Sequence, residues 1–245
     1  MLTSIIIVNF NTLDNLKNCV KSIRKHTTDY ELIIVDNGSK EEGTEDFIRK
    51  NSDEYILNPG NFGFAIGSNE GERISKGELI CFLNSDTIVE KDWLKLMKKT
   101  LNTNPKCVAV GPLGNPRYKQ VKEVCYQYQQ YVGQYSVDTR VFFLSGYCLL
   151  VYREEFEKYY FDEEFNLGLY EDNLLCEQIK FAGGELWVSS NAIVTHLGSE
   201  TFRKNNINYE DLEKVNQIIF RRKMEELHGW RKDEKHHIKW ERDKT

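Results

Sequence analysis

Residues 4–10 read Ser-Ile-Ile-Ile-Val-Asn-Phe, and residues 11–23 continue as Asn-Thr-Leu-Asp-Asn-Leu-Lys-Asn-Cys-Val-Lys-Ser-Ile. The first segment is rich in β-branched residues, which predicts a buried strand. In the second segment apolar residues recur at helical spacing, at Leu13, Leu16, Val20 and Ile23. A strand that leads directly into an amphipathic helix predicts the first β–α unit of an α/β fold.

The same alternation continues to about residue 101. The predicted strands cover residues 31–35, 55–57 and 79–83, and the predicted helices cover residues 41–50, 65–75 and about 89–101. Strands that alternate with helices in this way predict a mostly parallel central sheet flanked by helices. Beyond residue 112 the pattern becomes irregular. There we expect a strand over 141–151, a helix over 171–181, short strands over 186–188 and 193–196, and an amphipathic helix around 212–219.

Composition is that of a folded globular protein. The 245 residues are 40% hydrophobic and 29% charged, which suits one α/β domain with appendages. The apolar run over 142–151 is interrupted by Ser145 and Gly146, and no basic segment followed by a hydrophobic one opens the chain. The six cysteines show no CxxC spacing and are typical of small core residues in a reducing compartment. We therefore expect a cytoplasmic protein.

Charge is unevenly distributed along the chain. The net charge of −5 argues against general binding of nucleic acid, but residues 221–245 carry nine Lys/Arg against six Asp/Glu. This basic tail also contains Trp230 and Trp240, and such a segment can lie on an anionic membrane surface. A solvated helix end of mixed charge is the simpler interpretation.

Polar residues follow each of the first four predicted strands, where ligands bind in open parallel sheets. They are Asn9 and Asn11, Asp36, Asn61 and Gly63, and Asn84, Ser85 and Asp86. Each set has a purely structural alternative. Asn11 or Thr12 can cap the following helix, Asp36 can form an Asx-type turn, and glycines can supply unusual backbone angles.

Asp86 and the pair Glu171-Asp172 are the strongest candidates for chemistry. A carboxylate at the mouth of a sheet can hold a hard cation that neutralises a departing diphosphate, although Asp86 could instead cap a helix beginning near Val89. Glu171 and Asp172 open the predicted helix over 171–181, where one can act as a general base. Acids in a first turn are also favoured by the helix dipole alone. His196, which ends a short apolar strand, is a metal ligand only if Asp86 lies nearby.

Aromatic residues are dense between Tyr118 and Tyr135, with Tyr147 and Trp187 further on. They offer flat surfaces for sugar rings, while core packing is their simpler use.

Five segments, taken together and in order, resemble the inverting GT-A glycosyltransferases of family 2, particularly bacterial rhamnosyltransferase-like members. With His196 they cover roughly residues 3–200. The segments are Ile7-Val8-Asn9-Phe10-Asn11, Val35-Asp36-Asn37-Gly38-Ser39, Asn61-Phe62-Gly63-Phe64-Ala65 with Gly67-Ser68-Asn69-Glu70-Gly71, Leu83-Asn84-Ser85-Asp86-Thr87, and Phe161-Asp162-Glu163-Glu164-Phe165 with Tyr170-Glu171-Asp172.

The resemblance implies a GT-A (Rossmann-like) single domain over residues 1–205, with a nucleotide-binding half over about 1–112 and a smaller acceptor half over about 113–205. Residues 206–245 would be a C-terminal helix and the basic tail. The nucleotide-sugar site would consist of Val8, Asn9, Asn11, Asp36, Asn61, Gly63, Ser85 and Asp86. Asp36 would lie near the base or ribose, and Ser85 and Asp86 near the diphosphate.

The same resemblance implies the chemistry. Asp86, with His196 as a further ligand, would hold Mn²⁺ or Mg²⁺. Asp172 would deprotonate the acceptor hydroxyl beside Glu171, and a single displacement would invert the anomeric centre. The implied donor is a UDP- or dTDP-sugar, and the acceptor a glycan, a lipid-linked molecule or a protein, with surface glycan synthesis at the inner face of the membrane as the setting.

Two departures from the family pattern bear on metal affinity and on donor choice, respectively. Asn84 replaces the first acid of the commoner DxD triplet, which leaves Asp86 as its single carboxylate. After Asp172 the family often has a further acid and an arginine where this chain has Leu174 and Gln178.

Two other functions remain open. A sugar nucleotidyltransferase shares the architecture, but no glycine-rich loop with a basic residue follows the first strand to hold a triphosphate. A non-catalytic nucleotide- or sugar-binding module is the second, and retention of both Asp86 and Asp172 counts against it. The sequence leaves the sugar, the base, the acceptor and the oligomeric state undetermined.

Overall fold

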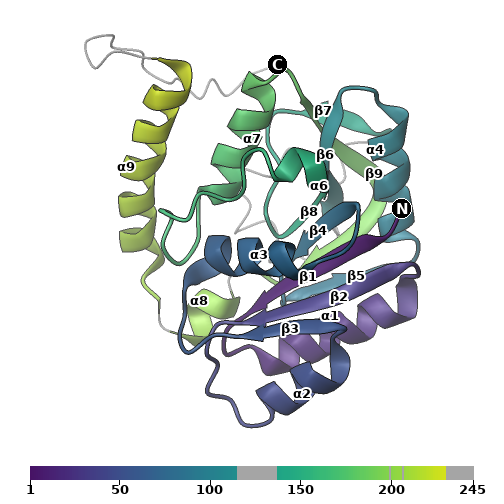
Figure 1. Ribbon diagram of the computed structural model, residues 1–245, viewed down its shortest axis with the longest axis vertical. Coiled ribbons are helices and arrows are strands. Elements are labelled where there is room, and N and C mark those ends of the chain that lie inside the picture. The colour runs from purple at the N-terminus through teal and green to yellow at the C-terminus, as the bar shows by residue number, and fades with distance from the viewer. Residues whose placement is uncertain (115–136, 199, 206, 230–245) are drawn as a thin grey trace.

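The computed structural model describes residues 1–114, 137–198, 200–205 and 207–229 (Figure 1). The strands are β1 (Thr3–Asn9), β2 (Tyr30–Asp36), β3 (Glu54–Leu57), β4 (Leu79–Leu83), β5 (Thr87–Val89), β6 (Cys107–Gly114), β7 (Thr139–Val141), β8 (Cys148–Tyr152) and β9 (Glu185–His196). The helices are α1 (Leu13–His26), α2 (Thr44–Asn51), α3 (Gly63–Ile74), α4 (Trp93–Thr103), α6 (Arg153–Phe156), α7 (Glu171–Phe181), α8 (Glu200–Lys204) and α9 (Tyr209–His228).

The described strands form a single nine-stranded sheet. Its order is β3-β2-β1-β4-β8-β6-β9-β5, and β7 pairs with β9 outside this path. Strands β1 to β4 are parallel neighbours, and Asn9 lies opposite Asp36 in their register. The polar residues that end β1 and β2 therefore lie side by side at the carboxyl ends of these strands. This confirms the predicted α/β architecture with helices on both faces.

The second half of the sheet is mixed. Strand β8 runs antiparallel to β4 and β6, whereas β6 and β9 are parallel. Strand β5 is antiparallel to β9 and places Thr87 opposite His196. This pairing brings the residue before Thr87, which is Asp86, next to the end of β9.

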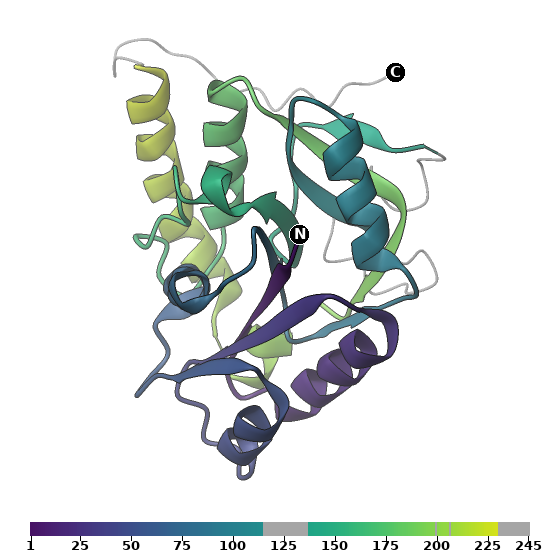
Figure 2. The same ribbon diagram turned by 45° about the vertical axis from the view of Figure 1, so that its right-hand side comes forward.

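Two apolar layers cover the two faces of the sheet. Alternate residues of β1 point to opposite sides, so Ile5 and Ile7 join the core against α1, α2 and α4, whereas Ile6 joins the core against α3, α6 and α7. Figures 1 and 2 show α1 and α2 on one side of the sheet and α7 on the other. Each fully buried aliphatic side chain contributes about 1.5–3 kcal/mol relative to exposure.

Three sequence predictions of secondary structure were wrong. The segment after Asp86 is the strand β5, because Thr87 and Val89 are buried against β9, and α4 begins only at Trp93. The predicted strand over 141–151 is two strands, β7 and β8, separated by a segment that contains Ser145 and Gly146. The two short strands over 186–196 are one strand, β9, with an irregular register against β6.

Helix α9 packs on the rest of the protein through a small apolar cluster. Phe220 and Met224 of α9 lie against Phe165 and Leu174. The tyrosine-rich segment from 118 to 135 and residues 230–245 of the basic tail lie outside the described residues. Within the described ranges, every helix is too short or too polar to cross a bilayer. Five cysteines are buried free thiols, as predicted, and Cys125 lies outside the described ranges.

Candidate functional site

The ends of β1 and β2 are joined by a hydrogen-bond network around Asp36. Asp36 Oδ1 accepts from Asn9 Nδ2 at 2.7 Å and from Ser39 Oγ at 2.6 Å. Its Oδ2 accepts from the Ser39 backbone N–H at 2.8 Å, so the predicted Asx-type turn forms. We call Asn9, Asn11, Asp36 and Ser39 the Asp36 network. The carboxylate orders this edge of the sheet; its predicted contact with a base or ribose stays a prediction.

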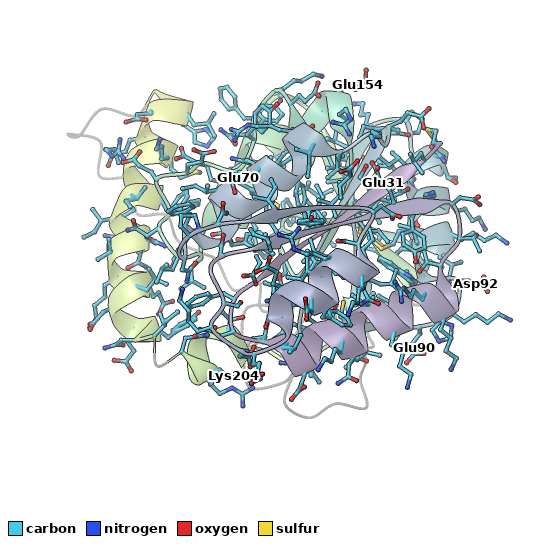
Figure 3. All side chains as sticks on the ribbon, turned by 60° about the horizontal axis from the view of Figure 1, so that its bottom comes forward. Glu31, Glu70, Glu90, Asp92, Glu154 and Lys204 are labelled. Carbon is cyan, nitrogen blue, oxygen red and sulfur yellow. The ribbon has the colours of Figure 1, made fainter. Side chains whose placement is uncertain are left out.

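Asn11 extends this network to both sides. It adopts a left-handed backbone with φ of 52°, which Asn tolerates better than most residues. Its backbone N–H donates to Ser39 Oγ at 2.8 Å, and its Nδ2 donates to Asn205 Oδ1 at 2.6 Å. Figure 3 shows Lys204, which ends α8, at this side of the molecule, where its Nζ is 3.9 Å from Glu41 Oε1. The segment after β9 therefore returns to the first loop.

Thr12 connects the Asp36 network to the segment after β4. It precedes α1, but its side chain makes no capping hydrogen bond to that helix, so the alternative of Thr12 as a side-chain cap is wrong. The hydroxyl donates to Asn9 Oδ1 at 2.8 Å and lies 3.0 Å from Ser85 Oγ. Ser85 and Asp86 are only 3% and 4% exposed. Both polar loops thus form one continuous network.

Asn61 and Gly63 shape the loop before α3. Asn61 Oδ1 accepts from the Gly63 N–H at 3.0 Å and from Asn37 Nδ2 at 3.4 Å. Gly63 has φ of 89°, and a Cβ there would lie 1.8 Å from the carbonyl oxygen of Asn166. Only glycine fits, so this loop closely approaches the second half of the protein. A Cβ on Gly67 would likewise meet Val8 Cγ1 at 3.0 Å, so α3 lies directly on the end of β1.

Asp86 and His196 lie together, as the metal hypothesis required. His196 Nε2 is 3.1 Å from Asp86 Oδ1 and 3.4 Å from Asn84 Nδ2. The imidazole stacks on Tyr147, with the ring centroids 4.8 Å apart and the planes at 6°. Asp86 does not cap a helix, because β5 carries the chain away to Glu90 and Asp92, which Figure 3 shows at the end of the molecule opposite Lys204.

The separation of Asp86 Oδ1 and His196 Nε2 is that of a direct hydrogen bond and is also compatible with a shared divalent cation. Two ligands at right angles on an ion with bonds of about 2.1 Å lie about 3 Å apart. Carboxylate suits Mg²⁺ and Mn²⁺, and imidazole is a common ligand of transition metals. Among the described residues no group of three or more His, Cys, Asp or Glu could hold an ion.

Glu171 and Asp172 form the second acidic centre. Asp172 Oδ2 accepts from the Gly146 N–H and its Oδ1 from the Asn173 N–H, both at 2.8 Å. Burial raises the pKa of Asp172 to about 6, against the lowering effect of these N–H donors. Burial, followed by the neighbouring Asp172 charge, raises the pKa of Glu171 well above its usual value. The helix dipole acts in the opposite direction, because it favours the charged form of acids in a first turn.

Gly146 and Tyr147 connect the two acidic centres. The Gly146 N–H bonds Asp172, and the ring of the next residue, Tyr147, stacks on His196, which contacts Asp86. A Cβ on Gly146 would lie 3.3 Å from Asp172 Cβ, so the small residue permits this close approach. The structure therefore brings the candidate base and the candidate metal ligands to two neighbouring residues of the chain.

Sequence reasoning missed some roles in this site. Ser39 and Thr12 were noted only as turn or cap residues, and Asn205 gave no local signal because its partners are distant in sequence. Tyr147 was proposed as a surface for sugars, but its ring contacts His196. Trp187 is partly buried and packs against the core, with Nε1 donating to Glu185 Oε2 at 3.1 Å.

Comparison with known proteins identifies the family of this chain. Residues 4–160 match Glycosyl transferase family 2. The poly(ribitol-phosphate) beta-N-acetylglucosaminyltransferase TarP of Staphylococcus aureus (strain N315) is 30% identical over 120 residues, which are 45% of this chain and 36% of TarP. Six curated relatives match 40% to 45% of this chain, and the matches span 29% to 38% of their own length.

Solved structures share the fold. The mannosyltransferase PcManGT from Pyrobaculum calidifontis, in complex with GDP-Man and Mn²⁺, aligns with a TM-score of 0.65 at 15% identity, over 92% of this chain and 69% of its own. S. aureus TarS in complex with UDP-GlcNAc aligns with a TM-score of 0.60 at 17% identity, over 80% of this chain and 58% of its own. The fold is therefore GT-A-like. Since the sequence match covers more than half of the chain, this protein belongs to glycosyl transferase family 2.

Proposed function

We propose that this protein transfers a sugar from a nucleotide-sugar donor to an acceptor hydroxyl, with inversion at the anomeric carbon and with the help of a divalent metal. The observation that carries the proposal is the Gly146-Tyr147 connection between the Asp86–His196 pair and Asp172. A displacement needs charge stabilisation on the leaving group and a base for the nucleophile, and these residues supply one on each side.

The donor binds at the Asp36 network and the loop that contains Asn61 and Gly63. Val8, Asn9 and Asn11 line the nucleotide, while Ser85 and Asp86 lie toward the diphosphate. Asp86 and His196 hold Mn²⁺ or Mg²⁺, and the cation supplies charge stabilisation for the departing diphosphate. This assignment is supported by the Thr12 bridge, which ties the two loops into one rigid surface.

Asp172 is the general base. Because its pKa is about 6, it is largely ionised at neutral pH and can accept the proton of the acceptor hydroxyl. Burial and the neighbouring Asp172 charge raise the pKa of Glu171 well above its usual value, which disfavours a second negative charge beside Asp172. The Gly146 N–H orients the carboxylate by donating a hydrogen bond to Oδ2.

Several finer features belong to the same proposal. The donor is a UDP- or dTDP-sugar of the hexosyl or rhamnosyl type, and the product is part of a bacterial surface glycan. The acceptor is a glycan, a lipid-linked molecule or a protein, presented at the inner face of the membrane. The basic tail, which begins at Arg221, supports such a peripheral contact through its charge.

The decisive experiment is thermal stabilisation by UDP, dTDP, GDP and CDP, each with and without Mn²⁺. A ligand that binds only the folded protein stabilises it by about 2.7 kcal/mol at a hundredfold excess over its Kd. We expect a shift that is selective for one base and depends on Mn²⁺. Absence of any shift would contradict the donor site. Sugar transfer from the matching nucleotide sugar, tested against label incorporation from a nucleoside triphosphate, then separates glycosyl transfer from nucleotidyl transfer.

A further inference from the structure

The turn that enters α7 has an unusual backbone. Gly168, Leu169 and Tyr170 have φ of 136°, 79° and 77°. Left-handed geometry is disfavoured for residues with a branched or bulky side chain, and two such residues in succession persist only where their surroundings hold them. Glu171 and Asp172 follow directly. We call residues 166–170 the α7 turn. Its conformation determines the position of Asp172 in the first turn of α7.

Asn216 of α9 holds the α7 turn from outside. Its Nδ2 donates to the carbonyl oxygen of Gly168 at 2.6 Å and to that of Leu169 at 3.1 Å. The residue is fully buried, and its Oδ1 has no hydrogen-bond partner among the described residues. A buried amide with an unsatisfied oxygen is unfavourable by itself. The two hydrogen bonds that its amide donates to the turn offset this cost.

Other contacts of α9 reach the same segment. The Phe220 ring packs on Tyr170, with centroids 5.3 Å apart. Lys223 Nζ lies 2.5 Å from Asp162 Oδ2, and Arg222 pairs with Glu164. Figures 1 and 2 show α9 running alongside α7. Helix α9 thus contacts the chain on both sides of the α7 turn.

We propose that Asn216 is a positioning residue of the transfer reaction. By fixing the left-handed α7 turn, it holds the Asp172 carboxylate against the Gly146 N–H, 2.8 Å away. The inference rests on the proposed function, since that function makes Asp172 the base. It extends the active site to α9, which lies beyond the residues 4–160 that match the family.

The first test requires no substrate. The Gly146 N–H reports directly on Asp172, although it is distant from Asn216 in sequence, so its hydrogen exchange is measured by NMR in variants. In Asn216→Ala we expect exchange at Gly146 to rise by about tenfold or more, because the α7 turn opens more often. Met224→Ala is the matched control: it loosens the same helix at its apolar cluster but leaves both bonds to the turn.

The second test is turnover. Release of nucleoside diphosphate is measured with UDP-glucose, UDP-N-acetylglucosamine, dTDP-rhamnose and GDP-mannose in Mn²⁺. Asn216→Ala should lower kcat by about tenfold with the donor KM unchanged, as expected for a displaced base. Adding Leu169→Gly should restore part of kcat, because glycine adopts the left-handed conformation without the bonds to Asn216. Asn216→Asp, which keeps the shape and removes the donors, serves if the alanine variant does not fold.

The outcomes separate this inference from the proposed function. If Asn216→Ala and Met224→Ala change Gly146 exchange and kcat equally, α9 merely stabilises the fold and the inference is wrong. If Asp172→Asn abolishes turnover while Asn216→Ala leaves both readouts unchanged, the inference fails and the base assignment stands. If Asp172→Asn keeps full turnover while Gly146 exchange rises in Asn216→Ala, the base assignment fails, and with it the catalytic role of Asn216.

Discussion

The carboxylates of the Asp36 network and of the acidic pair at the start of α7 have opposite environments. Asp36 accepts three hydrogen bonds from Asn9 and Ser39 and is satisfied. Glu171 is buried with Oε2 unpartnered among the described residues, and the pKa values of both Glu171 and Asp172 are raised. Under the proposed function, the first region binds the nucleotide and the second transfers a proton.

The difference has a structural origin. The Asp36 network follows from the register of two adjacent parallel strands, which places Asn9 opposite Asp36. The acidic pair depends on a left-handed turn held by a distant helix. Binding surfaces can therefore arise from local sheet geometry, whereas a carboxylate with a raised pKa needs long-range support against its own desolvation.

The largest expected effect is on turnover in Asp172→Asn. A general base contributes about 10²–10⁴-fold to rate, so kcat should fall by that factor. Because Asp172 belongs to the proton-transfer region, the affinity for the nucleoside diphosphate in Mn²⁺ should stay within about twofold of the parent. Asp46→Asn, on the exposed surface of α2, is the control. Parental turnover in Asp172→Asn would remove the distinction between the two regions.

Asp86→Ala should act on binding instead. Loss of one metal ligand is expected to weaken Mn²⁺-dependent nucleotide binding by about 10–100-fold, comparable to the loss of supporting groups around other metal sites. Binding measured without Mn²⁺ should change little. Titration calorimetry with the nucleotide selected in the thermal panel, at several Mn²⁺ concentrations, measures both values. Equal affinity in the parent and the variant at low Mn²⁺ concentration would exclude Asp86 as a ligand.

Asp172→Asn should also stabilise the fold at neutral pH. Burial raises the pKa of Asp172 to about 6, so the folded protein binds its proton more tightly than the unfolded chain does. The stability that comes from this proton is present below about pH 4 and is lost as pH rises through 6. The neutral variant escapes that loss.

The expected gain in unfolding free energy is about 1–2 kcal/mol at pH 7.5, less than the roughly 3 kcal/mol for two pKa units, because Asn has one acceptor oxygen and can accept from only one of the Gly146 and Asn173 N–H groups. Urea unfolding at pH 4 and pH 7.5 measures it. The gain should vanish at pH 4. A variant that is less stable than the parent at pH 7.5 would show that these hydrogen bonds outweigh the desolvation of the carboxylate.

Sequence reasoning reached the Asp36 network more easily than the acidic centres. Apolar runs that end in Asn9 and Asp36 predict the strand ends, and parallel pairing then predicts that they meet. Contact between Asp86 and His196 depends on β5, which is only three residues long and was taken for the start of a helix. Its antiparallel pairing with β9 has no signal in a segment so short.

The left-handed backbone of Leu169 and Tyr170 in the α7 turn gave no signal in the sequence. Leu169 and Tyr170 carry no mark of a left-handed backbone, since neither is Gly, Asn or Asp. Their conformation is imposed by Asn216, which is distant in sequence, and Asn216 reads locally as one polar residue of an amphipathic helix. The helix over 171–181 was predicted with the bounds of α7, but the reason for its starting point is tertiary.

The smallest expected effect is that of substituting Tyr147. Its neighbour Gly146 bonds Asp172, whereas its own ring contacts His196. Its ring stacks on His196, and aromatic pairs contribute about 0.5–1.5 kcal/mol beyond their buried area. Tyr147→Leu should therefore weaken Mn²⁺-dependent nucleotide binding by about two- to tenfold. Tyr147→Phe keeps the ring and should bind as the parent does. Both variants should keep the Gly146 bond to Asp172, because it involves only the backbone of the neighbouring residue. If Tyr147→Leu leaves metal-dependent binding intact but lowers kcat, Tyr147 supports the base Asp172 rather than the metal ligand His196. Tyr147 would then belong with the acidic pair of α7 and not with the Asp86–His196 pair.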